Sequence, residues 1–168
     1  MTDYSALAVA DIRKYIWQKI QDAGILSSDD YYVDSLDTHL VPIVPAQQIP
    51  EFDNLLAGRT YMFYDFETKL IPVQWWMIDE KFTLTTLSQN YDVINKINNL
   101  IVDLFRRYDE SAADLNGFLG DNSNFLYRYI NLDSAMSPEP FESEGDYQYG
   151  VISISYQYSR KTGADGRF

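Results

Sequence analysis

A single histidine, His39, and the absence of cysteine leave this chain few residues for nucleophilic, general-base or metal chemistry. A serine hydrolase needs a histidine oriented by a third group, and no GxSxG elbow, HExxH pair or phosphate-binding glycine loop accompanies His39. Thiol catalysis, disulfides and thiolate metal sites need cysteine. These residues predict a protein that is not an enzyme and uses no cofactor or metal.

Two groups of acidic residues offer carboxylates. The first lies in an irregular segment and consists of Asp29, Asp30, Asp34 and Asp37. Calcium prefers several oxygen ligands, but this spacing lacks the turn glycine and terminal glutamate of an EF-hand loop, so we expect a solvated loop. The second flanks two prolines and consists of Glu139, Glu142, Glu144 and Asp146. Paired carboxylates also serve glycosidases, but such crowded like charge is more typical of an extended loop.

Aromatic residues make up 15% of the chain, with 14 Tyr, 9 Phe and 3 Trp. Such side chains suit either the buried centres of subunit interfaces or an ordinary β-rich core. Trp75 and Trp76 are adjacent, so on a strand one would face the core and the other would need cover from a loop or another subunit. The candidate interface residues are Trp75, Trp76, Tyr147, Tyr149, Glu139, Glu142, Glu144, Arg160 and Lys161.

Charge and length narrow the classes of function. The 25 acidic and 13 basic residues give a formal charge of −12, which opposes binding to phosphate backbones and anionic membranes. A DNA mimic, or a protein past which DNA slides, is compatible with that charge.

At 168 residues we expect one domain over residues 1–159 and a flexible tail over 160–168. No signal peptide and no run of 18 apolar residues is visible, so we expect synthesis in a reducing cytoplasm and no membrane contact.

Apolar residues recur at three- and four-residue spacing near the start of the chain, at Val9, Ile12, Ile16 and Ile20. This spacing predicts a helix, with Thr2 or Ser5 as its N-cap and Gly24 as a left-handed stop.

A second helix is predicted by a wider apolar stripe, at Ile94, Ile97, Ile101, Leu104, Phe105 and Tyr108. Ser88 or Asn90 is its candidate cap. The following residues, 109–124, contain Gly117 and Gly120 and are expected to form a loop.

Period-two alternation is clearest in the run over residues 147–158, where one face carries Ile152, Ile154, Tyr156 and Tyr158. It predicts a long strand with one buried face, paired as a hairpin with residues 125–132.

Three earlier segments, 60–66, 70–78 and 81–87, predict an antiparallel meander whose first turn is residues 67–69. Residues 40–44 contain Pro42, which cannot donate to a ladder, so we expect a short edge strand there. The rest of residues 27–58 is expected to be irregular.

These elements predict an α+β fold, a mixed, mainly antiparallel curved β-sheet packed against two helices. Their order, together with residues 75–86 and 90–112, resembles the tail terminator or tail-completion (neck) proteins of contractile- and long-tailed bacteriophages. The resemblance covers about residues 60–159 and is one of pattern and order, since no short motif marks it.

The resemblance implies a structural virion protein, assembled in the host cytoplasm, that forms a homohexameric ring at the head-proximal end of the tail tube. Its implied partners are the tail tube protein on one side and a neck or connector protein on the other, and contact with the sheath protein stays open. DNA would pass through the lumen without specific binding. The resemblance supplies no catalytic residues.

Two other classes of function stay open. The charge of −12 fits an acidic binding module, a DNA mimic or another inhibitor of a host protein, although the acids gather in two loops and not on one face. A small hydrolase or isomerase would need an apolar pocket enclosing a carboxylate.

Overall fold

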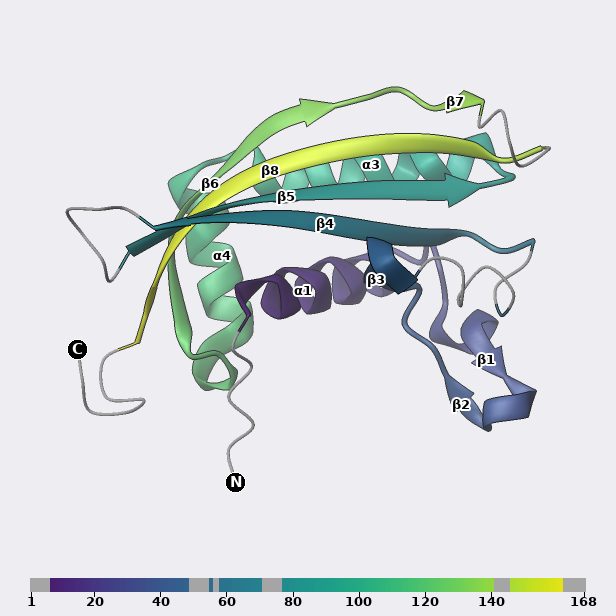
Figure 1. Cartoon of the computed structure of the whole chain (residues 1–168), viewed down its shortest axis with the longest axis horizontal. Helices are drawn as coiled ribbons and strands as arrows, with labels where there is room; N and C mark the ends of the chain where they lie inside the picture. Colours follow the sequence, from purple (N-terminus) through teal and green to yellow (C-terminus); the bar gives the residue numbers. More distant parts are fainter. Residues whose placement is uncertain (1–6, 49–54, 56–57, 71–76, 141–145, 162–168) are drawn as a thin grey trace.

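The computed structural model describes residues 7–48, 55, 58–70, 77–140 and 146–161. The elements, in chain order, are α1 (Ala8–Asp22), η1 (Ser28–Tyr31), β1 (Tyr32–Val33), η2 (Asp34–Leu36), β2 (Thr38–His39), β3 (Ile43–Pro45), η3 (Ala46–Gln48), β4 (Tyr61–Leu70), β5 (Met77–Ser88), α3 (Tyr91–Phe105), α4 (Asp109–Leu119), η4 (Gly120–Asn122), β6 (Phe125–Ala135), β7 (Glu139–Pro140) and β8 (Gln148–Arg160). Figure 1 shows the long strands arched side by side above α1 and α4.

The main sheet has the order β3-β4-β5-β8-β6, and β7 pairs with β8 beside β6. All of its pairings are antiparallel except β3 with β4, which is parallel. The predicted α+β class with a mixed, mainly antiparallel sheet is confirmed. The predicted edge strand near Pro42 is confirmed as β3, which starts at Ile43 and pairs only with β4.

One face of the sheet meets the helices. The four residues predicted to share the buried face of β8 are all at most 4% exposed, and they are Ile152, Ile154, Tyr156 and Tyr158. From the helices the same core receives Ile12, Ile16, Ile20, Ile97, Ile101, Phe105, Leu115 and Leu119. Period-two burial on the strands and 3.6-residue burial on the helices therefore meet in one apolar layer.

The predicted helix boundaries are confirmed in part. Gly24 has φ +69° just after α1, and the Asn90 side chain accepts a hydrogen bond from the Asp92 N–H at the start of α3. The prediction that Thr2 or Ser5 caps α1 is wrong, because the helix begins at Ala8 after Leu7, whose side chain makes no cap bond. Burial of the first turn under the sheet, where Ala8 is 0% exposed, fixes this start instead.

The predicted turn at residues 67–69 is wrong. Strand β4 continues through it to Leu70, and its partner β5 matches it residue for residue from Leu87 down to Ile78. Glu67 lies opposite Lys81 and Lys69 opposite Asp79, so opposite charges face each other across the pair, an arrangement that stabilises strands. The described residues of the predicted segments 60–66, 70–78 and 81–87 therefore belong to two long strands and not three, and residues 71–76 lie outside the described residues. Trp75 and Trp76 lie outside the described residues.

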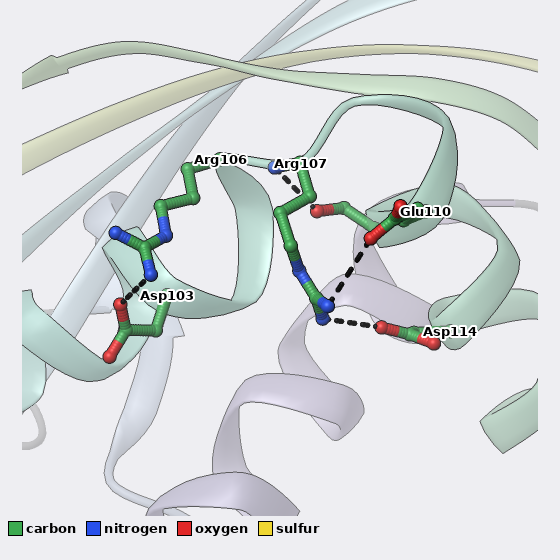
Figure 2. Close-up of polar contacts among 6 residues, drawn as sticks. Asp103, Arg106, Arg107, Glu110 and Asp114 are labelled. Carbon is green, nitrogen blue, oxygen red and sulfur yellow. Dashed lines mark hydrogen bonds and ion pairs between the residues drawn. The ribbon is translucent and has the colours of Figure 1, made fainter.

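The predicted loop at 109–124 is also wrong over most of its length, because residues 109–119 form helix α4 and residues 120–122 form η4. Figure 2 shows how α4 is joined to α3: the Arg107 guanidinium meets Glu110 at 3.4 Å and Asp114 at 2.8 Å. The Ser111 hydroxyl accepts a hydrogen bond from the Arg107 N–H at 3.0 Å. Gly117 sits exposed in the helix, where a glycine costs about 1 kcal/mol, and burial of Leu115 and its neighbours offsets that cost.

Candidate functional site

The face of the sheet opposite the helices is polar over residues 65–69 of β4, 79–83 of β5 and 153–157 of β8, whereas Tyr61, Leu87 and Tyr149 occupy the same face at one end of the sheet. On β4 and β5 it carries the cross-strand charge pairs of Glu67 with Lys81 and Lys69 with Asp79. On β8 the alternate residues are small or polar, Ser153, Ser155 and Gln157. An antiparallel sheet tolerates such a face in water, so this surface needs no further helix to cover it.

A shallow cavity of about 290 Å³ lies on the sheet and is lined by Glu67, Lys69, Asp79, Glu80, Lys81, Tyr129, Ser155 and Tyr156. The Asp79 carboxylate accepts hydrogen bonds from Gln157 at 3.1 Å and from the Tyr129 hydroxyl at 3.4 Å. The cavity thus mixes two lysines with three carboxylates already engaged across strands or by hydrogen bonds. Such a surface suits polar contact with a partner.

On the helix side, Glu80 is only 3% exposed and lies in a cluster of tyrosines. Its carboxylate accepts hydrogen bonds from Tyr156, from Tyr158 at 3.3 Å and from Thr68 at 2.7 Å. Burial, followed by the nearby Glu80 charge, raises the pKa of Tyr156 and of Tyr158 above 10.0, so both phenols stay protonated donors. The donors therefore use the lone pairs of this carboxylate within the fold.

A second buried carboxylate, Asp11 on α1, joins that helix to the sheet. It accepts hydrogen bonds from Ser123 at 2.5 Å and Tyr127 at 3.0 Å. Burial raises its pKa above 3.8, against the opposing effect of those two hydrogen bonds and of Lys14. Buried polar groups are costly unless paired, so this cluster fixes α1 in place.

The outer edge of β6 is partly capped by side chains and a neighbouring turn. The Asn116 amide donates to the Tyr127 carbonyl at 2.8 Å and accepts from the Tyr127 N–H at 2.9 Å, as a neighbouring strand would. The Tyr108 carbonyl accepts from the Ile130 N–H at 3.4 Å. Tyr108 has an unusual backbone (φ 57°, ψ −103°), and its half-exposed ring stacks on Tyr129 with centroids 5.0 Å apart. These contacts protect the first half of the edge from pairing with another chain.

Two stretches of strand edge have no pairing partner within the described part of the chain. On β4, the parallel neighbour β3 covers only Met62–Tyr64, which leaves residues 65–70 open. On β6, residues 131–135 continue past the caps and pair only with β8. An open edge presents rows of backbone donors and acceptors that another strand can pair with.

The structure brings three of the predicted interface residues together at one end of the sheet. Tyr149 lies opposite Glu139 in the pairing of β8 with β7, and the Tyr149 hydroxyl reaches the Glu139 carboxylate at 3.4 Å. The Tyr147 hydroxyl accepts a hydrogen bond from the Gly58 N–H at 2.8 Å. Its ring packs edge-on against Tyr61, with centroids 6.4 Å apart.

Arg160 and Lys161 lie at the other end of β8. Arg160 pairs with Phe125 in the sheet, and the Lys161 ammonium donates to the Gly120 carbonyl at 2.6 Å. The remaining predicted interface residues, Trp75, Trp76, Glu142 and Glu144, lie outside the described residues.

His39 and the first acidic group lie on the surface near β1 and β2. The His39 Nε2 is 3.4 Å from an Asp29 carboxylate oxygen, and both side chains are at least half exposed. Across the described residues, no cluster of three or more His, Cys, Asp or Glu side chains has an arrangement that could hold a metal ion.

The open edges, the Glu80 and Asp11 clusters and the Asn116 cap are functional or structural features that sequence reasoning missed. Glu80 carried a usable signal, because it alternates with apolar Ile78 and Phe82 on the face of β5 that proved to be buried.

In comparisons with known proteins, no family model and no curated protein matches this chain. Within the described residues, no helix is long and apolar enough to cross a membrane.

Proposed function

We propose that this chain is a structural subunit that closes into a homo-oligomeric ring, the tail terminator or tail-completion ring of a phage tail. The observation that carries the proposal is the pair of open edges, on β4 and β6, at opposite sides of one sheet. A head-to-tail contact between unlike surfaces generates a ring when its rotation closes.

Strand direction favours such a contact. From β4 through β5 and β8 to β6, every neighbour is antiparallel, so β4 and β6 themselves run in opposite directions. When β6 of one copy lies beside β4 of the next, the antiparallel alternation continues without a break. Ring closure then pairs both open edges, which removes the risk of open-ended aggregation.

The polar face supports a channel-lining role in that ring. Its acidic residues, Asp65, Glu67, Asp79 and Asp133, outnumber its basic residues, Lys69, Lys81 and Arg128, by one. Duplex DNA adheres to proteins that neutralise its phosphates, so an acidic lumen lets DNA pass with little binding. The tail tube protein and a neck or connector protein would contact the two rims.

A proline on the open edge of β4 tests the ring. The Met62 N–H donates to Pro42 on the β3 side, so by alternation the Phe66 N–H also points to the open side, away from β5. Phe66→Pro removes this donor and spares the bonds to β5, since proline is tolerated on edge strands. We expect light scattering and electron microscopy to show closed rings for the native chain and monomers for Phe66→Pro.

The matched control is Phe66→Val, which removes the same aromatic ring but keeps the N–H, and which should still form rings. A native chain that stays monomeric at all concentrations and leaves tail tubes uncapped would refute the proposal. Genes for tube, sheath and connector proteins beside this reading frame would support it independently.

The alternative of an acidic DNA mimic has less support. A mimic needs carboxylates spaced like phosphates over one face, whereas Glu67 and Asp79 each lie opposite a lysine. Displacement of a DNA-binding protein from DNA by this chain would favour the mimic over the ring.

A further inference from the structure

The Asn116 side chain that caps β6 belongs to the only Asn-Gly pair in the sequence. Asn116 and Gly117 lie in the last turn of α4, where the Asn116 carbonyl also accepts a hydrogen bond from the Gly120 N–H that ends the helix. The Asn116 side chain is half-buried, whereas Gly117 is exposed, and a Cβ placed on Gly117 would meet no atom within 4 Å. The side chain that holds this sheet edge is therefore followed by a residue that offers no steric hindrance.

An asparagine followed by glycine is prone to spontaneous deamidation for a steric reason. The backbone nitrogen of the following residue attacks the asparagine Cγ, and glycine has no Cβ to obstruct the attack. The new N–Cγ bond closes a cyclic imide, a succinimide, while the Cγ–Nδ2 bond breaks and Nδ2 leaves as ammonia with the proton of the attacking N–H. Water then opens the imide at either carbonyl, and the product is aspartate or isoaspartate.

We propose that Asn116 is a deamidation site that the folded structure protects and that opens when the end of α4 unravels. In the folded chain the Asn116 Nδ2 donates to the Tyr127 carbonyl at 2.8 Å, and the Tyr127 N–H donates to Asn116 Oδ1 at 2.9 Å. The helical backbone adds a second restraint, because the N–H of residue 117 donates to the carbonyl four residues earlier. The leaving nitrogen and the attacking nitrogen are thus both engaged while the helix is intact.

The end of α4 is the weakest part of that helix. Gly117 is a poor helix former, and Gly120 ends the helix with φ +52°. Helix ends open locally at a smaller free energy than the whole fold requires. Each opening frees the amide and lets the backbone at residues 116 and 117 rotate, so we expect slow deamidation in the folded chain and fast deamidation in the unfolded chain.

Deamidation removes one half of the β6 cap. A carboxylate at position 116 still accepts from the Tyr127 N–H but has no N–H to donate, so the Tyr127 carbonyl would face a negatively charged oxygen. The isoaspartate product also lengthens the backbone within the last turn of α4. Either product weakens the protection of the β6 edge, and an unprotected edge is open to pairing with another chain. This consequence holds whether or not the chain forms rings.

Peptide mapping by mass spectrometry tests the site. The native chain is incubated in mildly alkaline buffer, folded in one sample and unfolded by guanidinium chloride in another. Asn131 is the internal control, because it is exposed on the same strand edge and precedes the bulky Leu132. We expect Asn116 to deamidate faster than Asn131 in the unfolded chain and folding to slow Asn116 strongly. An Asn116 rate no higher than that of Asn131 in the unfolded chain would remove the site, and equal Asn116 rates in the two samples would remove the protection by the fold.

Two variants separate the chemistry from its consequence. Gly117→Ala keeps Asn116, crowds the attacking nitrogen and favours the helix, so it should slow deamidation of the folded chain at least about twofold. A rate equal to that of the native chain would count against attack by the nitrogen of residue 117.

Asn116→Asp imitates the aspartate product. Its Tm should lie below that of the native chain at neutral pH, and the difference should shrink below about pH 4, because a protonated carboxyl again donates to the Tyr127 carbonyl. A Tm equal to that of the native chain at neutral pH would overturn the loss of the cap.

Discussion

Gly150→Ala is the sharpest test of how the helices meet the sheet. A Cβ at Gly150 would lie 2.8 Å from the Ile94 Cγ2 and 2.9 Å from the Asn98 Nδ2, well inside the 3.4–4 Å of ordinary contact. The Ile94 side chain is buried and β-branched, so it has little freedom to move aside. The Asn98 amide donates to the Met136 carbonyl at 3.1 Å and would be pushed off that bond.

These two effects set the magnitude. Overpacking a tight site costs about 1–3 kcal/mol, and the lost hydrogen bond adds about 0.5–1.5 kcal/mol. We therefore expect the free energy of unfolding of Gly150→Ala to fall by about 2–4 kcal/mol. For a chain of this length that corresponds to a drop in Tm of roughly 5–15 °C.

Thermal and urea unfolding followed by circular dichroism would measure this loss. Gly117→Ala is the matched control, because it makes the same substitution inside a helix where nothing lies within 4 Å of the new methyl group. Alanine is the better helix former, so Gly117→Ala should gain about 0.5–1 kcal/mol. If Gly150→Ala has the same Tm as the native chain, α3 does not approach β8 as closely as argued.

Three further substitutions test the buried polar contacts. Asn116→Ala should lower the free energy of urea unfolding by about 1–3 kcal/mol, because the N–H and the carbonyl of Tyr127 both lose their partner. An unchanged free energy of unfolding would show that water replaces the Asn116 cap. Glu80→Leu should lower the free energy of unfolding by at least about 1–3 kcal/mol, because the buried Tyr156 hydroxyl loses its acceptor. Its control, Glu67→Leu on the exposed face, should change the free energy of unfolding by no more than about 0.5 kcal/mol. Equal losses in the two variants would contradict the burial argument. For Asp11 the folded-state pKa is raised by burial, so the stability contributed by its carboxyl is fully present below 3.8 and is lost as pH rises through the folded pKa. Asp11→Asn, which does not titrate, should therefore gain stability relative to the native chain between about pH 3 and about pH 7 in urea unfolding, and parallel pH curves would contradict this.

The parts of the fold that sequence predicted are those where one residue pattern matched one environment. Strand β8 alternates cleanly because a single face is buried, and α3 shows its stripe because a single side meets the sheet. The break between β4 and β5 was misplaced because exposed charges on a long hairpin look like a turn until the pairing of Glu67 with Lys81 is known. Helix α4 was missed because Gly117 suggests a loop, whereas tertiary burial of Ala112 and Leu115 overrides propensity.

The candidate site was predictable only where its residues adjoin along the chain. Tyr147 and Tyr149 lie close to Glu139 because one hairpin connects them, and their type already suggested a contact surface. By contrast, Asp11 meets Ser123 and Tyr127 across more than 100 residues, and no local pattern encodes such a meeting. Open edges are likewise a property of strand order, which single-sequence periodicity does not supply.

The distribution of open and protected edge constrains how a ring would close. Followed across the sheet through β5 and β8, the open residues of β4 lie in the same rows as the β6 residues from Ser134 back to Tyr127. Asp65 shares a row with Ser134, and Lys69 shares a row with Tyr129. The β6 caps occupy part of that stretch, so two copies joined without offset would bring Lys69 against a protected edge. Sliding one copy along the strands by about two residues brings the unprotected stretches into better register. A stagger between neighbours is what tilts strands relative to the axis in any closed sheet, so the caps at Asn116 and Tyr108 would set the tilt as well as protect the monomer.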